Sequence, residues 1–311
     1  MRPSYWDPSK TGELWIERAG LVAEEARRAR ARPSREDASR VAAFGIDVQV
    51  GFCTPGASLF VPGAVEDTRR AVDWIYANLA RLTTLVFSLD THEAFQIFHP
   101  AWWQDEAGAP PAPLTPIRAA DVRARRWRAR RFPEQSADYV ERLEASGRYV
   151  LTVWPYHTLL GGTSHALVPA MMECALYHAI ARDEPTRLVV KGRHPKTEMY
   201  SVLSPEVTEV GGERVGGLDA ELLAELERHD RVYVFGQAKS HCVLSTLRDV
   251  ARAAPALLRK VWVLEDATSP VPAPPIDPLP PELDFPRVAE RAFAELALQG
   301  MHVCRTTDPL P

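Results

Sequence analysis

The chain has 311 residues, which is long enough for one large domain or two small ones with a full hydrophobic core. A formal net charge of −4 gives no general reason to expect nucleic acid as a partner. No apolar run reaches the length of a membrane span and the first residues lack a signal-peptide core, so we expect a cytoplasmic protein with no membrane partner. The four cysteines are too few and too scattered for a disulfide scaffold, so we expect free thiols at Cys53, Cys174, Cys242 and Cys304.

The chain begins with a helix that the sequence predicts over residues 11–32 and that ends in an arginine-rich stretch. We expect residues 1–37 to form an N-terminal helical extension, either solvated or packed on a neighbouring subunit. Residues 38–311 then form the main domain, and we expect the protein to be a homo-oligomer.

Strands and helices alternate along the main domain. Apolar runs predict strands over residues 41–46, 84–89, 149–154, 187–190, 232–236 and 260–264. Helical spacing of apolar residues predicts helices over about residues 62–81, 164–182, 218–228, 242–253 and 286–299. Such alternation is typical of a parallel sheet covered by helices on both faces. We therefore predict a single α/β domain, a three-layer α/β/α sandwich around a central parallel sheet.

Two other segments are unusual in composition. Residues 93–147 show no clear strand, and an insert within them, near residues 104–147, carries seven arginines between Arg118 and Arg131. These arginines can bind phosphates, but a solvated or inter-subunit face is the commoner role of such a run. Seven prolines near residues 270–281 predict a stiff surface loop.

Ionisable residues gather at the predicted carboxyl ends of the strands. In parallel sheets, binding sites form beyond those ends. The residues at or just past them are Asp47, Asp90, His92, His157, Lys191 and Cys242. Because all six share one edge of the sheet, we expect a single pocket.

Cys242 lies where a predicted strand turns into a helix. Free backbone N–H groups and the helix dipole favour a negative charge there, so we expect a lowered pKa and a nucleophilic thiolate. Asp47 is placed to take the thiol proton, and the ammonium of Lys191 to stabilise the thiolate. The alternatives are structural: a small buried side chain at the junction, a turn-capping aspartate and a lysine that extends to solvent.

Asp90, His92 and His157 together offer one carboxylate and two imidazoles. This set suits one divalent transition metal, zinc first, with iron or manganese as alternatives, and it leaves positions open for water or substrate. A strand-end aspartate or histidine is also commonly a plain turn residue. Both roles stay open at this point.

Five segments stand in order along the chain. They are Asp47-Val48-Gln49 with Phe52-Cys53, Gly56-Ala57-Ser58-Leu59 and Val61-Pro62-Gly63; Asp90-Thr91-His92 with His99-Pro100; Trp154-Pro155-Tyr156-His157; Val190-Lys191-Gly192; and Gly236-Gln237-Ala238 through Cys242-Val243. Together they resemble the motifs of the nicotinamidase/isochorismatase-like cysteine hydrolases, and within them the metal-containing nicotinamidase–pyrazinamidase branch. The resemblance runs from about residue 40 to residue 267 and more weakly to the end.

The resemblance implies a role for each of these residues. Asp47 becomes the base, Lys191 the partner that stabilises the thiolate, and Cys242 the nucleophile. A cis peptide bond before Ala238 aims the N–H groups of Ala238 and Cys242 at an oxyanion. The implied metal ligands are Asp90, His92 and His157.

Three departures from the family pattern surround the mouth of the pocket. Val50-Gly51 stands where many relatives have Asn-Asp, Thr158 where nicotinamidases usually have cysteine, and Lys239-Ser240 where Thr-Asp is more usual. The six core residues are intact. The departures therefore bear on the substrate more than on the chemistry.

The resemblance implies hydrolysis of a small carboxamide through a thioester, with nicotinamide as the best candidate substrate. The metal would hold the pyridine nitrogen, and Phe52 with Trp102 or Trp103 would sandwich the ring. Three alternatives remain: a related amidase acting on another amide, a hydrolase with His241 or His157 as base, and a ligand-binding or assembly protein without catalysis.

Overall fold

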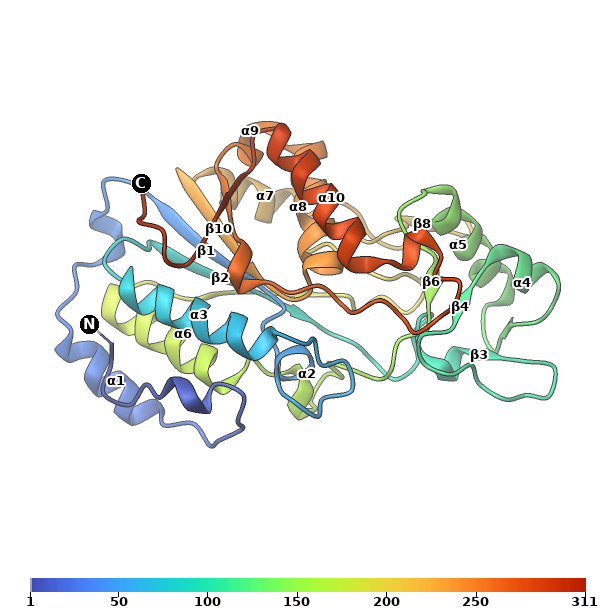
Figure 1. The fold of residues 1–311 in the computed structure, drawn as a ribbon, viewed down its shortest axis with the longest axis horizontal. Coiled ribbons are helices and arrows are strands. Elements are labelled where there is room, and N and C mark those ends of the chain that lie inside the picture. Colours follow the sequence, from blue (N-terminus) through green and yellow to red (C-terminus); the bar gives the residue numbers. More distant parts are fainter. Residues whose placement is uncertain (1) are drawn as a thin grey trace.

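The computed structural model describes residues 2–311 and is organised around one six-stranded sheet. The strand order is β12-β11-β10-β1-β2-β7, and every neighbouring pair is parallel. The strands are β1 (Val41–Ile46), β2 (Thr84–Asp90), β7 (Arg187–Lys191), β10 (Arg231–Gly236), β11 (Val261–Leu264) and β12 (His302–Cys304). The predicted three-layer fold with a central parallel sheet is confirmed (Figure 1).

Helices cover both faces of the sheet (Figure 1). One face carries α1 (Ala19–Arg28), α3 (Ala64–Ala77) and α6 (Pro169–Arg182), and the other carries α7 (Ala220–Glu227), α8 (Leu244–Ala253), α9 (Pro255–Leu258) and α10 (Phe285–Leu298). β1 is buried throughout: Phe44 and Ile46 join the core under α8 and α10, and Val41 and Ala43 join the core under α3 and α6. A strand covered on both faces needs a continuous apolar run, which explains its sequence. Among residues 2–311, no helix has both the length and the apolar character that a membrane crossing needs.

A lobe at one end of the molecule is formed largely by residues 104–147 (Figure 1). The short elements here and nearby are α4 (Ala119–Arg123), α5 (Pro133–Ala145), β3 (Trp103–Gln104) paired with β5 (Arg128–Ala129), β4 (Pro116–Ile117) paired with β6 (Leu151–Thr152), and β8 (Glu209–Val210) paired with β9 (Glu213–Arg214). α5 was not predicted, although Ser136, Tyr139, Val140 and Leu143 are buried at helical spacing. The arginine-rich segment before α5 led us to treat the whole insert as irregular, so the helical spacing of these apolar residues was not recognised.

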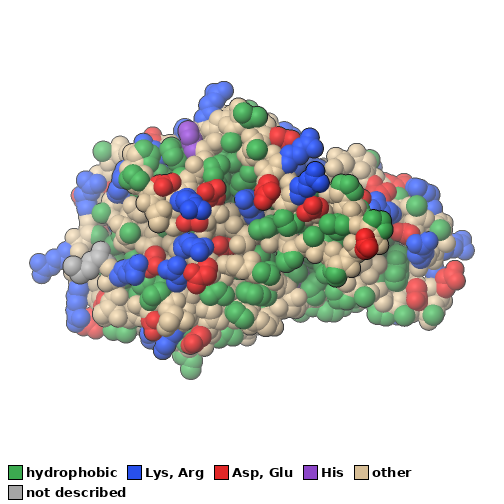
Figure 2. Space-filling view, viewed as in Figure 1, with side chains coloured by type: hydrophobic (Ala, Val, Ile, Leu, Met, Phe, Trp, Pro, Cys, Tyr) green, Lys and Arg blue, Asp and Glu red, His purple; other side chains and the backbone are tan. Residues whose placement is uncertain are grey.

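The arginine run of the lobe is paired in part: three of its seven arginines contact acidic residues. Its ion pairs are Arg118–Glu282 at 2.9 Å, Arg123–Glu141 at 2.8 Å and Arg126–Asp121 at 3.0 Å. Figure 2 shows blue and red side chains side by side on this lobe. Such mixed charge is typical of a solvated face.

The predicted strand over residues 149–154 is wrong in extent and in partner. Only Leu151–Thr152 is extended as a strand, and it pairs antiparallel with Pro116–Ile117, outside the central sheet. The sixth place in the sheet belongs to β12. Val153 and Trp154 are buried all the same, against the lobe. An apolar run therefore predicted burial correctly, but periodicity does not identify the strand that pairs with it.

The N-terminal helix is shorter than predicted. It covers only Ala19–Arg28 and packs on α6 of the same chain through Val22 and Ala26. The residues before it extend along the domain, because Trp15 Nε1 donates to Glu173 over 3.0 Å and Arg18 forms an ion pair with the same carboxylate at 2.8 Å. These tertiary contacts outweigh the helical preference of the segment.

The backbones of β1 and β10 approach very closely at their carboxyl ends. Gly236, the last residue of β10, has φ of 113°, and a Cβ there would lie 2.1 Å from the carbonyl oxygen of Ile46. Only glycine fits this conformation and this space. The contact holds the turn after β10 against the end of β1.

Candidate active site

The six ionisable residues predicted to share one pocket lie together in the interior, although His157 follows β6, which is outside the central sheet. Asp47 follows β1, and Asp90 and Lys191, which are paired in register, end β2 and β7. Cys242 lies in a π-helical turn, Lys239–Val243, that leads into α8. His92 and His157 follow in the loops, and all six side chains are buried.

Lys191 lies at the centre of the charged group. Its Nζ is 3.1 Å from Asp47 Oδ2, 2.7 Å from Asp90 Oδ1 and 3.6 Å from Cys242 Sγ, and it donates to the carbonyl of Met199 over 2.9 Å. Burial disfavours the ammonium, but the two carboxylates raise the pKa of Lys191 well above its ordinary value. It is a fixed cation beside the sulfur.

Asp47 is held so that one oxygen faces the thiol. Its φ is 49°, a left-handed conformation that aspartate tolerates. Ser88 Oγ donates to Asp47 Oδ1 over 2.6 Å, and the backbone N–H of Asp47 donates to the same hydroxyl over 3.0 Å. Oδ2 is left toward Lys191 and Cys242. Burial raises the pKa of Asp47, and Lys191 opposes that rise.

The prediction of a lowered pKa for Cys242 is wrong for the resting site. Burial raises the pKa of the Cys242 thiol well above its ordinary value; Lys191 opposes the rise, and Asp47 and Asp90 add to it. Desolvation and two carboxylates thus outweigh one ammonium and the helix start. The sulfur carries its proton until a base removes it.

The loop before Cys242 has the expected backbone. The peptide bond between Gln237 and Ala238 is cis, as the resemblance implied. Gln237 Nε2 donates to Asp67 Oδ2 over 2.9 Å, which anchors the loop in the core. Ala238 and Cys242 both line the cavity.

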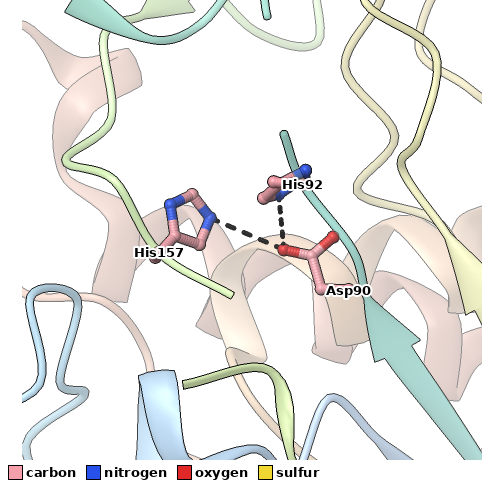
Figure 3. Close-up of side chains that lie close together, drawn as sticks. All are labelled: Asp90, His92 and His157. Atoms are coloured by element: carbon pink, nitrogen blue, oxygen red, sulfur yellow. Dashed lines mark ion pairs between the residues drawn. The ribbon is translucent and has the colours of Figure 1, made fainter. Parts of the chain in front are cut away.

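Asp90, His92 and His157 converge on one point (Figure 3). Asp90 Oδ2 lies 2.7 Å from His92 Nε2 and 3.5 Å from His157 Nε2, and one ligand atom from each of the three residues lies within 4.8 Å of the others. Both Nδ1 atoms face backbone carbonyls, that of Gly192 at 3.3 Å and that of Pro155 at 2.7 Å. This arrangement turns both Nε2 atoms toward Asp90, as metal-binding histidines require. Burial lowers the pKa of His157, which favours the neutral imidazole that a metal needs. The residues therefore fit a divalent cation.

Three further residues surround the Asp90–His92–His157 cluster, and the sequence did not predict their structural roles. Gln49 bridges the loop to β2, since its Oε1 accepts from Asp90 N at 2.8 Å and its Nε2 donates to Asp90 O at 2.9 Å. Gly192 has φ of 81°, and a Cβ there would lie 3.1 Å from Asp90 Oδ1. Within residues 2–311, the buried Nε2 of His99 has no hydrogen-bond partner, and burial lowers the pKa of His99 to about 3. Only the His99-Pro100 motif marked this histidine in the sequence.

A small cavity joins the two groups. The lining residues are Phe52, Leu59, Val61, Asp90, His92, Trp154, His157, Glu198, Met199, Tyr200, Ala238, His241, Cys242 and Val271. Asp47 and Lys191 lie behind this wall, in contact with Asp90 and Cys242.

Phe52 lies on the cavity wall, but Trp102 and Trp103 do not, and this expectation is corrected. Both tryptophans are fully buried in the core: Trp102 Nε1 donates to Ser136 Oγ over 3.0 Å and Trp103 Nε1 to the carbonyl of Ile97 over 2.6 Å. Trp102 is the last residue of a 3-10 turn, Pro100–Trp102, and Trp103 follows it; the turn directs both rings into the core. The aromatic wall is made instead by Trp154, Tyr200 and His241.

Several solved structures with the same fold are nicotinamidases. The Acinetobacter baumanii nicotinamidase pyrazinamidease has a TM-score of 0.53 and 21% identity, over 88% of this chain and 100% of that chain. The yeast nicotinamidase bound to the inhibitor nicotinaldehyde has a TM-score of 0.54 and 18% identity, over 85% of this chain and 99% of that chain. No protein-family model and no curated protein sequence matches the chain. The chain therefore shares the α/β/α fold of these nicotinamidases.

Proposed function

We propose that the protein is a cysteine amidohydrolase of the nicotinamidase type. It hydrolyses a small carboxamide to the acid and ammonia, and nicotinamide is the first candidate substrate. One observation carries the proposal: Lys191 Nζ lies 3.1 Å from Asp47 Oδ2 and 3.6 Å from Cys242 Sγ. A carboxylate, a cation and a thiol in contact beside a cavity are the parts of an activated nucleophile.

The acyl transfer begins at Cys242. Asp47 takes the thiol proton as the sulfur attacks the carbonyl carbon of the amide, and Lys191 stabilises the thiolate that forms. Asp47 then gives the proton to the leaving nitrogen, the C–N bond breaks, and ammonia departs from a thioester. Water, deprotonated by Asp47, attacks the thioester and releases the carboxylic acid and the thiol. The raised pKa of Cys242 is consistent with this order of steps, because the thiol keeps its proton until the substrate is bound and Asp47 removes it.

The tetrahedral intermediate needs donors for its oxyanion. The backbone N–H groups of Ala238 and Cys242 are assigned this role, since both residues line the cavity beside the sulfur. Removal of one such donor typically costs about 10²–10³ in kcat.

Asp90, His92 and His157 would hold one divalent transition metal, and zinc, iron and manganese all accept this ligand set. When bound, the metal supplies a Lewis acid that can hold a ring nitrogen of the substrate. Phe52 packs edge-on against His157 with ring centroids 5.5 Å apart, and it bounds the space in which the ring would lie.

A second candidate is a related amidase that acts on another amide. The polar side chains of His241 and Glu198 line the cavity, and the pyridine ring of nicotinamide has no further polar group to bind them. Both side chains therefore favour a different amide. A histidine base has less support: His241 Nδ1 bonds Ser240 Oγ at 2.9 Å, and His157 Nε2 faces Asp90. A non-catalytic binding protein would not need the buried Asp47–Lys191–Cys242 contact. Cytoplasmic location and a homo-oligomer remain predictions from the sequence.

Ammonia release from a set of amides tests the proposal. The set is nicotinamide, benzamide, which lacks the ring nitrogen, and an aliphatic amide of similar size. We expect hydrolysis of nicotinamide above the other two in the metal-loaded protein. Hydrolysis of the aliphatic amide alone would favour the second candidate, and no ammonia from any amide would contradict both.

A further inference from the structure

One wall of the cavity is made of rings, and His241 lies at its centre. The imidazole centroid is 5.3 Å from the ring of Trp154 and 5.2 Å from that of Tyr200. Away from these, Tyr149 stacks on the imidazole at 5.7 Å and Phe285 packs edge-to-face with it at 4.7 Å. Packing on several sides holds the imidazole in one orientation.

Val271 and Ser240 fix which nitrogen of His241 carries the proton. The backbone N–H of Val271 donates to Ser240 Oγ over 3.0 Å, and this oxygen lies 2.9 Å from His241 Nδ1. Ser240 is buried, so its own hydroxyl hydrogen needs an acceptor, and among residues 2–311 the acceptor that it meets is Nδ1. Ser240 therefore donates to Nδ1, and the neutral imidazole has its hydrogen on Nε2.

The Nε2–H group of His241 is left free on the cavity wall. Burial lowers the pKa of His241 to about 3, so the ring is neutral near neutral pH. Within the described part of the chain, no group pairs with Nε2, and this atom is not one of those enclosed without a partner. Since the residue lines the cavity, Nε2–H is open to a ligand there.

The neighbouring Trp154 ring has already used its N–H donor. Trp154 Nε1 donates to the hydroxyl oxygen of Tyr200 over 3.0 Å, and burial together with the nearby Glu198 carboxyl group raises the pKa of that hydroxyl. Among the residues that the structure describes, none forms a hydrogen bond with Glu198 Oε2. The aromatic wall therefore offers a ligand one oriented N–H donor, from His241.

We propose that His241 is a specificity-determining residue, whose Nε2–H donates a hydrogen bond to an acceptor atom that the substrate carries in addition to its amide and its metal-binding atom. This inference rests on the proposed function. It ranks the candidate ring carboxamides: those that bear a further oxygen or nitrogen acceptor should bind more tightly than nicotinamide itself. Ser240 is a positioning residue, because it acts only through the tautomer of His241. A buried donor left unpaired is costly, so ligands without this acceptor bind less well.

Binding to Cys242→Ala protein tests the proposal without turnover. Nicotinamides with one methoxy group, placed in turn on each free ring carbon, are compared by calorimetry with ethyl analogues of the same shape. At one ring position, we expect the methoxy compound to bind about 10-fold more tightly than its ethyl partner. The preference should disappear in His241→Phe, which keeps a ring without the donor, and persist in Glu198→Gln. No methoxy preference at any position overturns the proposal.

A second measurement reads the tautomer directly. Nitrogen-15 NMR of histidine-labelled, otherwise unmodified protein should show the hydrogen of His241 on Nε2, and Ser240→Ala should shift population toward Nδ1–H. A hydrogen on Nδ1 in the unmodified protein overturns the proposal. Failure of the proposed reaction gives a different result: no ammonia is released from any compound, while the methoxy preference in binding remains.

Discussion

The two ends of the cavity are built differently. At one end, Asp47, Asp90 and Lys191 are charges placed by the ends of three parallel strands, and Asp90 and Lys191 are neighbours in register. At the other end, Trp154 and Tyr200 come from segments outside any strand and make neutral hydrogen bonds. The sheet therefore fixes the bond-making groups, while loops shape what the substrate touches. Loops tolerate sequence changes far better than strand ends do, so the reaction can be conserved while the substrate specificity changes.

The largest effect expected at the charged end comes from the nucleophile. Cys242→Ala should lower kcat for ammonia release by at least about 10³-fold, since no other thiol lies in the cavity. The circular dichroism spectrum should not change, because alanine fits this buried junction. Cys304→Ala is the matched control, half-buried on β12, and should keep full activity. Ammonia release by Cys242→Ala at the normal rate would remove this sulfur from the reaction.

Lys191→Met should have the next largest effect. It leaves Asp47 and Asp90 without their shared cation, and breaking such a buried pair costs about 3–5 kcal/mol of unfolding free energy. Lys191 lowers the pKa of Cys242, so its loss raises that pKa, and the midpoint for alkylation by iodoacetamide should move to higher pH.

Lys260→Met provides the control for Lys191. Its Nζ donates to the carbonyls of Glu227 and His229, away from the cavity. Its removal should leave the alkylation midpoint in place. An equal midpoint in Lys191→Met and the unmodified protein would show that Lys191 does not act on the sulfur.

The metal cluster should be separable from the nucleophile. Elemental analysis should find close to one transition metal per chain, and His92→Ala should lose it, whereas His302→Ala on β12 should retain it. A chelator should weaken the binding of nicotinamide about 10-fold or more, and that of an aliphatic amide much less. Cys242 should keep its alkylation rate in the stripped protein, since Asp47 and Lys191 remain. Metal-free protein at every stage of a chelator-free preparation would contradict the assignment.

The smallest expected effect distinguishes Trp102 in the core from Trp154 on the cavity wall. Trp102→Phe loses the hydrogen bond to Ser136 and should lower the unfolding free energy by about 1 kcal/mol, with KM unchanged. Trp154→Phe should raise KM several-fold, because it loosens Tyr200 on the cavity wall. A raised KM in Trp102→Phe would place that residue at the substrate after all.

The sequence predicted the charged end better than the aromatic end, for a physical reason. Apolar runs that end in polar residues locate strand ends, and a parallel sheet brings such ends together whatever the loops do. Trp154 lies in a loop and Trp102 in a single 3-10 turn, where neither periodicity nor composition predicts the direction in which a ring points. Residues 149–154 were misplaced for the same reason. The raised pKa of Cys242 depends on distances to Asp47 and Asp90, which no sequence spacing contains.

The glycine at the end of β10 also limits how this protein can evolve. A side chain at Gly236 would meet the Ile46 carbonyl oxygen at 2.1 Å, and a backbone atom cannot move aside as a flexible side chain does. Even the methyl group of alanine is excluded, so Gly236 cannot be replaced stepwise by larger residues. In a saturation library, position 236 should tolerate nothing but glycine, while positions on the aromatic wall accept many residues. Substitutions on the aromatic wall can therefore change the substrate, while β10 and the turn that carries Cys242 stay the same.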